Sequence, residues 1–203
     1  VFEGCTATID CGRAVADDLF TAEEARRLLH LVQSVMRFGG GSGGPTIYDL
    51  ASGALSKDRH FIDIYTVLKE NNRGSPLDDE DRQLLRSVVG RIQAQIEQQF
   101  GVKGLALTAP TFFSRISAAE KAHIQNDEYW HLHVDREQYG SFDFTSLLYL
   151  SDYGADFTGG EFAFVDDENA SLVVEPRQGR VVMFTSGKEN THHVRRVVDR
   201  VRF

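Results

Sequence analysis

The sequence predicts an α+β fold, with helices in the first half of the chain and short strands in the second half. Within residues 15–101, two segments repeat apolar side chains at helical spacing. From residue 105 onward, seven short segments rich in Val, Phe, Tyr and Thr are separated by Gly, Asp or Pro. Strands that follow helices in this way indicate a double-sheet jelly roll (a double-stranded β-helix) buttressed by N-terminal helices.

The size and composition favour one folded domain. The chain has 203 residues, and 41% of them are hydrophobic, which is enough to bury a core. We therefore expect a single domain over residues 1–203. Its helical support covers about residues 15–101 and its jelly-roll core about residues 105–203.

The acidic composition disfavours general nucleic-acid binding. The formal net charge is -8, from 30 acidic and 22 basic residues, whereas phosphate contacts require clustered Lys and Arg. A basic peptide remains compatible as a substrate. No apolar stretch approaches the roughly 20 residues that a membrane-spanning helix needs. Residues 1–4 also lack the basic start and apolar run of a signal peptide.

Two helices are predicted in the first half. After an irregular or strand-like lead-in over residues 1–14, Thr-Ala-Glu-Glu at 21–24 has the form of a capping box, and apolar residues follow at helical spacing to near Phe38. Residues 78–100 form a longer helix with an apolar stripe, and Gly101 is its expected C-cap.

The segments between these helices are less decisive. The glycine-rich run of residues 39–45 is expected to be a mobile surface loop, because it lacks the Gly-Lys-Ser/Thr ending of a phosphate-binding loop. Such loops often border active sites. Residues 61–69 are compatible with either a helix or a strand.

The seven predicted strands follow from residue 105. Turn residues separate them, and their lengths are typical of a sandwich or barrel. Their expected ranges are 105–117, 129–135, 142–151, 161–165, 171–174, 180–185 and 190–203.

Two cysteines, Cys5 and Cys11, lie near the N-terminus. They are either unrelated small residues or the two halves of a local disulfide formed in an oxidising compartment, and the sequence does not decide between these. Neither lies near the histidine-rich second half, which excludes a thiolate zinc site there.

The strand predicted over residues 129–135 carries three candidate metal ligands, His131, His133 and Asp135. Because side chains alternate along a strand, all three are expected on one face, where two could share a metal and the third would lie behind them. A third ligand must come from elsewhere, and the His192-His193 pair is the other candidate. Two histidines and one carboxylate form a facial triad, which leaves positions open for oxygen and a co-substrate on non-haem iron.

A lone His-x-Asp pair is common in proteins, so neighbouring residues decide whether it is read as a pair of metal ligands. Arg202 follows His192 by ten residues, and an arginine there could bind a co-substrate carboxylate through two hydrogen bonds. Arg200 shares strand parity with Arg202 and could take its place.

Together these motifs resemble the 2-oxoglutarate and iron-dependent dioxygenases of the prolyl hydroxylase type. His133-Val134-Asp135 resembles the first motif of the family, and His192 with Arg202 resembles its distal histidine and co-substrate arginine. Further matches are the paired-glycine turn and strand at 159–164 and the Pro-x-x-Gly turn at 175–180. Residues 49–56, 129–135, 145–153 and 184–190 resemble one oxygenase-domain subgroup, and the similarity covers nearly the whole chain. The family usually has Gly at the position of Arg200.

The resemblance implies the cofactors and the site. Fe(II) would be held by His133, Asp135 and His192, with 2-oxoglutarate and O2 as co-substrates and ascorbate as an auxiliary. Tyr149 stands where related hydroxylases place a hydroxyl on the co-substrate carboxylate, and Leu147 would line the same pocket. The alternative for Tyr149 is an ordinary buried strand tyrosine. His192 is preferred to His193 because Val194, Val197 and Arg202 then follow at the spacings of the family.

Three functions are considered. The first is a hydroxylase that acts on a peptidyl side chain, with proline favoured by analogy, and releases succinate and CO2. The second is a zinc hydrolase with the same ligands, which leaves Arg202 unexplained. The third is a jelly-roll metal-binding module without turnover.

Tyr129 or Trp130 would face the substrate entrance or the core. The resembled subgroup implies a lumenal domain, with any membrane anchor outside this chain. The oligomeric state cannot be inferred.

Overall fold

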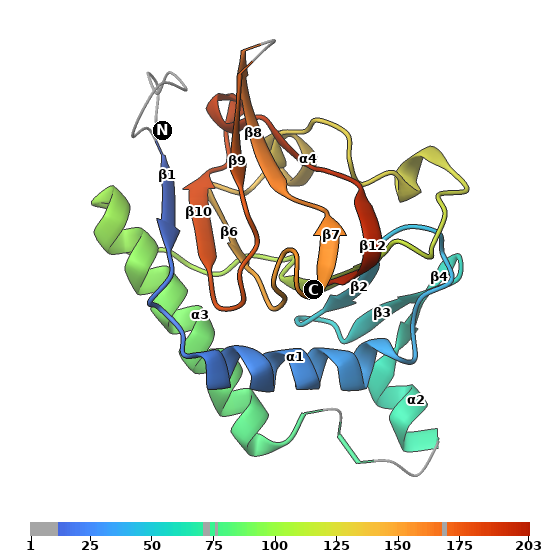
Figure 1. Cartoon of the computed structure of the whole chain (residues 1–203). Coiled ribbons are helices and arrows are strands. Elements are labelled where there is room, and N and C mark those ends of the chain that lie inside the picture. Colours follow the sequence, from blue (N-terminus) through green and yellow to red (C-terminus); the bar gives the residue numbers. More distant parts are fainter. Residues whose placement is uncertain (1–11, 71–73, 76, 168–169) are drawn as a thin grey trace.

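The computed structural model describes residues 12–70, 74–75, 77–167 and 170–203, and combines helices with antiparallel sheets (Figure 1). The mixed helix and strand content is the one predicted from the sequence. The cysteine pair, Cys5 and Cys11, lies outside the described residues.

The first predicted helix is α1, Ala22–Met36, and its start follows the predicted capping box. The Thr21 hydroxyl accepts from the Glu24 amide at 3.2 Å, and the Glu24 carboxylate accepts from the Thr21 amide at 2.9 Å. These two bonds satisfy amides that a helix start leaves unpaired. The apolar face of α1, which includes Leu28 and Val32, is buried.

The second predicted helix is α3, Asp79–Phe100. Asp78 caps it by accepting from the Asp81 amide at 2.7 Å, and Gly101 ends it with φ of 66°, the left-handed conformation that favours glycine. Side chains of α1 and α3 pack into one core with Val181 and Met183 from the sheets. Figure 1 shows both helices lying against the outside of the strands. None of the helices in the described ranges is both long and apolar enough to cross a membrane.

The strands form three antiparallel sheets. The first has the order β1-β10-β6, and the second has the order β11-β8-β9. The third has the order β4-β3-β2-β5-β12-β7. The strands of the first two sheets are β1 Arg13–Ala16, β10 Val181–Thr185, β6 Phe144–Leu148, β11 His192–Val194, β8 Phe162–Asp167 and β9 Ala170–Val174. Those of the third sheet are β4 His60–Asp63, β3 Ala54–Lys57, β2 Thr46–Asp49, β5 Phe112–Ser117, β12 Val197–Arg202 and β7 Phe157–Gly159.

Several predicted boundaries are wrong. The expected helical support over residues 15–101 also contains β2, β3 and β4, and the ambiguous segment 61–69 divides into β4 and helix α2, Ile64–Glu70. Of residues 105–117 only β5 is a strand, and β7 was not predicted. These short strands form because segments distant in the sequence pair with them, β5 with β2 and β12 with β7. The local sequence pattern does not indicate such pairing.

The predicted strand over residues 129–135 is also absent. His133 makes a single bridge to His192, and Asp135 begins the short helix α4, Asp135–Tyr139. Short 3-10 helices, η1 (Gln125–Asp127) and η2 (Lys188–Asn190), precede the two histidine segments. Figure 1 places α4 at the opposite end of the sheets from α1.

Candidate metal centre

Three side chains far apart in the sequence converge at the α4 end of the sheets. The Nε2 atoms of His133 and His192 lie 3.7 and 3.6 Å from Oδ1 of Asp135. One ligand atom from each residue can be chosen so that all three lie within 4.8 Å of one another. Such a set of two imidazoles and one carboxylate can hold a first-row divalent metal ion.

Backbone pairing brings the two histidines together. His192 is the first residue of β11, and its amide and carbonyl both bond to His133, at 3.1 and 2.9 Å. Asp135 arrives by a different route from the one predicted, because the chain turns at Val134 into α4. His131 therefore does not share a strand face with Asp135. Its Nε2 instead pairs with Glu128 at 2.5 Å, and its side chain is exposed.

Both histidine rings are held through the nitrogen that faces away from Asp135. His133 Nδ1 lies 3.0 Å from the carbonyl of His131, and His192 Nδ1 lies 2.8 Å from the carbonyl of Asn190. A carbonyl oxygen only accepts, so each neutral ring donates from Nδ1 and keeps its lone pair on Nε2. Both lone pairs are thus on the atoms that face Asp135.

The carboxylate of Asp135 is oriented by two hydroxyl groups. Its Oδ2 accepts from the Thr145 hydroxyl at 2.6 Å, and the Thr145 and Ser186 hydroxyls lie 2.8 Å apart. Oδ1 is left facing the imidazoles. Neither Thr145 nor Ser186 was singled out from the sequence. Thr145 lies two and four residues before Leu147 and Tyr149, so alternation along a strand places it on the same face as these candidate site residues. That was the signal in the sequence that could have identified Thr145.

Burial sets the protonation state of the distal histidine. His192 is almost fully buried, and this burial, assisted by the adjacent His133, lowers the pKa of His192 to about 4. The contacts to Asn190 and Asp135 oppose the shift. His192 is therefore neutral at pH 7, which is the form that binds metal ions. His193 lies outside the group, and its Nδ1 contacts the Trp130 carbonyl at 3.1 Å.

Arg202 is a buried cation without a counter-ion among the described residues. It is 6% exposed, and neither its Nε nor the hydroxyl of Tyr149 has a hydrogen-bond partner in that part of the chain. Burial lowers the pKa of Arg202, and burial also raises the pKa of Tyr149 against the opposing charge of Arg202. A buried charge without a partner is unfavourable, so these two groups fit an anionic ligand between them.

Tyr149, Leu147 and His192 all contact or belong to one apolar cluster. Tyr149 is buried in it, and Leu147 packs against it. The His192 ring lies 4.9 Å from the centroid of Phe162 and 5.0 Å from that of Phe184, both members of this cluster. The candidate metal ligand and the candidate co-substrate residues therefore share one hydrophobic environment.

Arg200 does not share the position of Arg202. It has φ of 62°, its side chain is exposed, and it donates to the Ala155 carbonyl at 2.8 Å. An irregularity in the pairing of β12 with β7 lies between Val197 and Asp199. The regular alternation of side chains therefore does not place Arg200 on the same face as Arg202. Of these two arginines, only Arg202 is buried.

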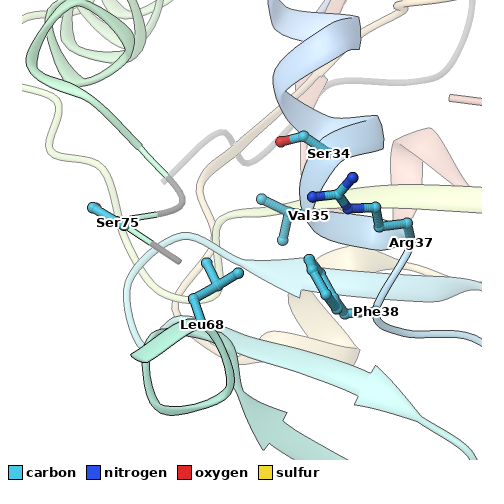
Figure 2. Close-up of a pocket in the computed structure, with 7 residues that line it drawn as sticks. Ser34, Val35, Arg37, Phe38, Leu68 and Ser75 are labelled. Carbon is cyan, nitrogen blue, oxygen red and sulfur yellow. The ribbon is translucent and has the colours of Figure 1, made fainter. Parts of the chain in front are cut away.

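Two surface pockets lie apart from these residues. The first, about 170 Å³, lies between α1 and α2, where Leu68 faces Val35 and Phe38 (Figure 2). The second is an open groove of about 420 Å³ beside the glycine-rich loop, where it is lined by Gly41 and His123 among others. No metal-centre residue lines either pocket, so neither is the candidate site.

Comparison with known proteins shows which proteins the chain is similar to. Residues 119–203 match the model of the 2OG-Fe(II) oxygenase superfamily. A "2-oxoglutarate and iron-dependent oxygenase domain-containing protein 3" of Rattus norvegicus is 48% identical over 199 residues, 97% of this chain and 62% of that protein. Prolyl 3-hydroxylase 1 of Gallus gallus is 28% identical over 226 residues, 97% of this chain and 29% of that protein. The chain thus spans about three fifths of the length of the first relative.

A solved structure shows the same fold. The prolyl hydroxylase of Trichoplax adhaerens superposes with a TM-score of 0.57 at 15% identity, over 94% of this chain and 80% of that one. His133, Asp135 and His192 form a group that could hold the iron of such an oxygenase. Residues 119–203 match the 2OG-Fe(II) oxygenase superfamily, whose cofactors are Fe(II), 2-oxoglutarate and O2. The prolyl hydroxylase resemblance expected from the sequence is confirmed.

Proposed function

We propose that residues 1–203 are one catalytic domain, built on a jelly-roll core, that hydroxylates a peptidyl side chain, with proline as the preferred target. The overall reaction converts 2-oxoglutarate, O2 and a C–H bond into succinate, CO2 and a C–OH group. One oxygen atom enters succinate and the other enters the product. Prolyl 3-hydroxylase 1 among the relatives, and the prolyl hydroxylase solved with a peptide fragment, support a peptide substrate.

His133, Asp135 and His192 would hold Fe(II), which when bound supplies the oxygen activation. The chain itself contributes orientation. Two backbone carbonyls hold the imidazoles, and the Thr145 hydroxyl holds the carboxylate, so the three ligand atoms are placed before any metal arrives. Groups that orient ligands in this way raise metal affinity.

The observation that carries the proposal is the buried guanidinium of Arg202, which has no carboxylate partner among the described residues and whose Nε has no hydrogen-bond partner there. We assign it to the carboxylate of 2-oxoglutarate that lies farther from the keto group, with the Tyr149 hydroxyl as a second donor. Leu147 would line the same space. The surrounding aromatic cluster excludes water, which strengthens a charge-assisted hydrogen bond. We expect ascorbate to act as an auxiliary by keeping the iron reduced.

The two alternatives explain less of the site. A zinc hydrolase would use the same three ligands and a bound water, but it has no use for a buried arginine beside Tyr149. A binding module without turnover has no need for a complete triad together with a buried cation. Neither alternative accounts for Arg202.

The test is succinate formation by the purified chain with Fe(II), 2-oxoglutarate and ascorbate, with and without a proline-centred peptide library. We expect succinate in both conditions and a peptide mass increase of one oxygen atom in the second. Replacing Fe(II) by Zn(II) should abolish both signals. Hydrolysis of a peptide or ester with Zn(II), without succinate under any condition, would instead establish the hydrolase.

A further inference from the structure

A cation–aromatic pair lies beside the candidate metal centre. The guanidinium carbon of Arg196 lies 3.6 Å from the centroid of the Trp130 ring. Trp130 precedes His133 by three residues, and Arg196 follows His192 by four. A strand rises about 3.3 Å per residue, so Arg196 lies within roughly 13 Å of the metal centre along the backbone.

The backbone on both sides of this pair is fixed. The Trp130 carbonyl contacts Nδ1 of His193 at 3.1 Å, and the Tyr129 hydroxyl accepts from the Val197 amide at 2.8 Å. The carbonyl of Arg196 accepts from the Gly160 amide at 3.0 Å. The Tyr129 and Trp130 rings pack edge to face with centroids 5.2 Å apart. The Arg196 side chain therefore rests on a rigid support.

Glycine makes the approach of Arg196 possible. At Gly159, φ is 69°, and an added Cβ would lie 2.2 Å from the Arg196 carbonyl oxygen. Any larger residue there would displace this backbone. The paired glycines found in the sequence thus set the position of Arg196.

The metal centre is exposed to solvent at His133. The side chain of His133 is 34% exposed, whereas those of Asp135 and His192 are 7% and 4% exposed. Trp130 is half-buried and Arg196 is exposed. Trp130 lies three residues before His133 in the chain, so a substrate that contacts the exposed part of His133 lies near the segment that carries Trp130.

The charge of Arg196 is uncompensated. Within the described ranges no carboxylate forms an ion pair with it, whereas its neighbour Arg195 contacts Glu161 at 3.6 Å. Stacking on an indole ring engages the face of a guanidinium and leaves its in-plane N–H groups free to donate. The overall charge of -8 was compatible with a basic substrate, whereas Arg196 itself is a cation without a carboxylate partner among the described residues.

We propose that Arg196, supported by Trp130, binds a side-chain carboxylate of the peptide substrate within about four residues of the hydroxylated position. This inference rests on the proposed function and narrows its substrate class to peptides with an acidic residue near the target. The spacing follows because an extended peptide covers the same roughly 13 Å in about four residues.

Trp130 is the single tryptophan of the chain, so its fluorescence reports directly on this surface. The experiment titrates the full chain, with Fe(II) and 2-oxoglutarate in the absence of oxygen, with two proline-centred peptides. One has Glu at alternate positions within four residues of the proline, and the other has Gln at the same positions. We expect the Glu peptide to change Trp130 fluorescence and to bind about three- to tenfold more tightly, as for an accessible ion pair.

Variants separate this surface from general electrostatics. Arg196→Gln should remove the preference for Glu, and Arg196→Lys should retain part of it, because Lys keeps the charge without the planar donors. Arg200→Gln is the matched control, since Arg200 is an exposed arginine four residues further along the chain that contacts Ala155 instead, and it should retain the full preference. Melting temperatures verify that each variant is folded.

Equal binding of both peptides, no fluorescence change with either, or a preference that survives in Arg196→Gln would each overturn the inference. Succinate formation by the wild-type chain without peptide decides the proposed function separately. Glu-selective binding without any succinate would leave Arg196 as a carboxylate-binding residue and refute the oxygenase activity.

Discussion

Nε of Arg13 donates to the side-chain oxygen of Asn190 at 2.5 Å, across 177 positions of the chain. The same guanidinium binds both carboxylate oxygens of Asp166, at 2.5 and 3.1 Å, and lies 4.3 Å from the centroid of Phe164. The Asn190 carbonyl in turn accepts from Nδ1 of His192. Strand β1 therefore supports the segment that carries the distal histidine.

Arg13→Ala should weaken metal binding as well as stability. Losing a largely buried, hydrogen-bonded ion pair should lower the unfolding free energy by about 2–4 kcal/mol, and looser orientation of His192 should lower metal affinity about tenfold. Co(II) titration by absorbance and thermal melting measure the two effects. Arg180→Ala is the control, because Arg180 forms a similar two-point ion pair with Asp17, and its side chain otherwise donates to the Glu175 carbonyl. Equal loss of affinity in both variants would show that only stability is involved.

The two adjacent histidines should differ in metal binding. His192→Ala should lose stoichiometric Fe(II) or Co(II) binding, because its Nε2 faces Asp135. His193→Ala should retain it, because that ring is directed to the Trp130 carbonyl. Metal content measured after desalting distinguishes the two variants. The opposite pattern would shift the register of β11 by one residue.

Arg202→Met should stabilise the chain while strongly weakening 2-oxoglutarate binding. Removing a buried cation that has no counter-ion among the described residues should raise the unfolding free energy by about 1–3 kcal/mol in the absence of co-substrate. Loss of the charged partner should weaken 2-oxoglutarate binding by about 2–5 kcal/mol. Calorimetry and melting curves measure both quantities. A lower melting temperature together with unchanged affinity would remove Arg202 from the site.

Arg200→Gly should raise stability. Arg200 has φ of 62°, a conformation that costs a non-glycine residue about 1 kcal/mol, and the exposed bond to Ala155 compensates only partly. We expect a gain of up to about 1 kcal/mol in chemical denaturation. Arg200→Ala is the control, since it loses the bond and keeps the strained backbone, and it should be less stable than the wild type. A glycine variant no more stable than the alanine variant would contradict this.

Glu24 should contribute a pH-dependent part of the stability. The Arg91 guanidinium at 2.6 Å, followed by the Thr21 amide, lowers the pKa of Glu24 from 4.5 to about 2. A lowered pKa in the folded state stabilises the chain above the unfolded value, and this contribution disappears as the pH falls from about 4.5 to 2. Because Glu24 is partly exposed, Glu24→Gln should cost about 1 kcal/mol at pH 7. The difference from the wild type should vanish near pH 2, and a constant difference across this range would exclude the ion pair as its source.

The sequence by itself determined the features that depend on near neighbours. Capping residues such as Thr21 and Asp78 satisfy amides within one helical turn, so both helix starts could be predicted to within a residue. The resemblance of its motifs to the oxygenase family likewise selected the three residues that the structure brings together, and it favoured His192 over His193.

Only the tertiary structure decided how those residues meet. Asp135 reaches the histidines from the start of α4 and not from a strand face, because the bridge between His133 and His192 ends after one residue pair. The left-handed backbone at Arg200 interrupts the alternation of side chains along the strand, so that Arg202 is buried and Arg200 is exposed. Thr145 and Arg13 act on residues 10 and 177 positions away. Contacts over such separations depend on which strands pair, and that pairing is set by burial of the whole core and leaves no local signal.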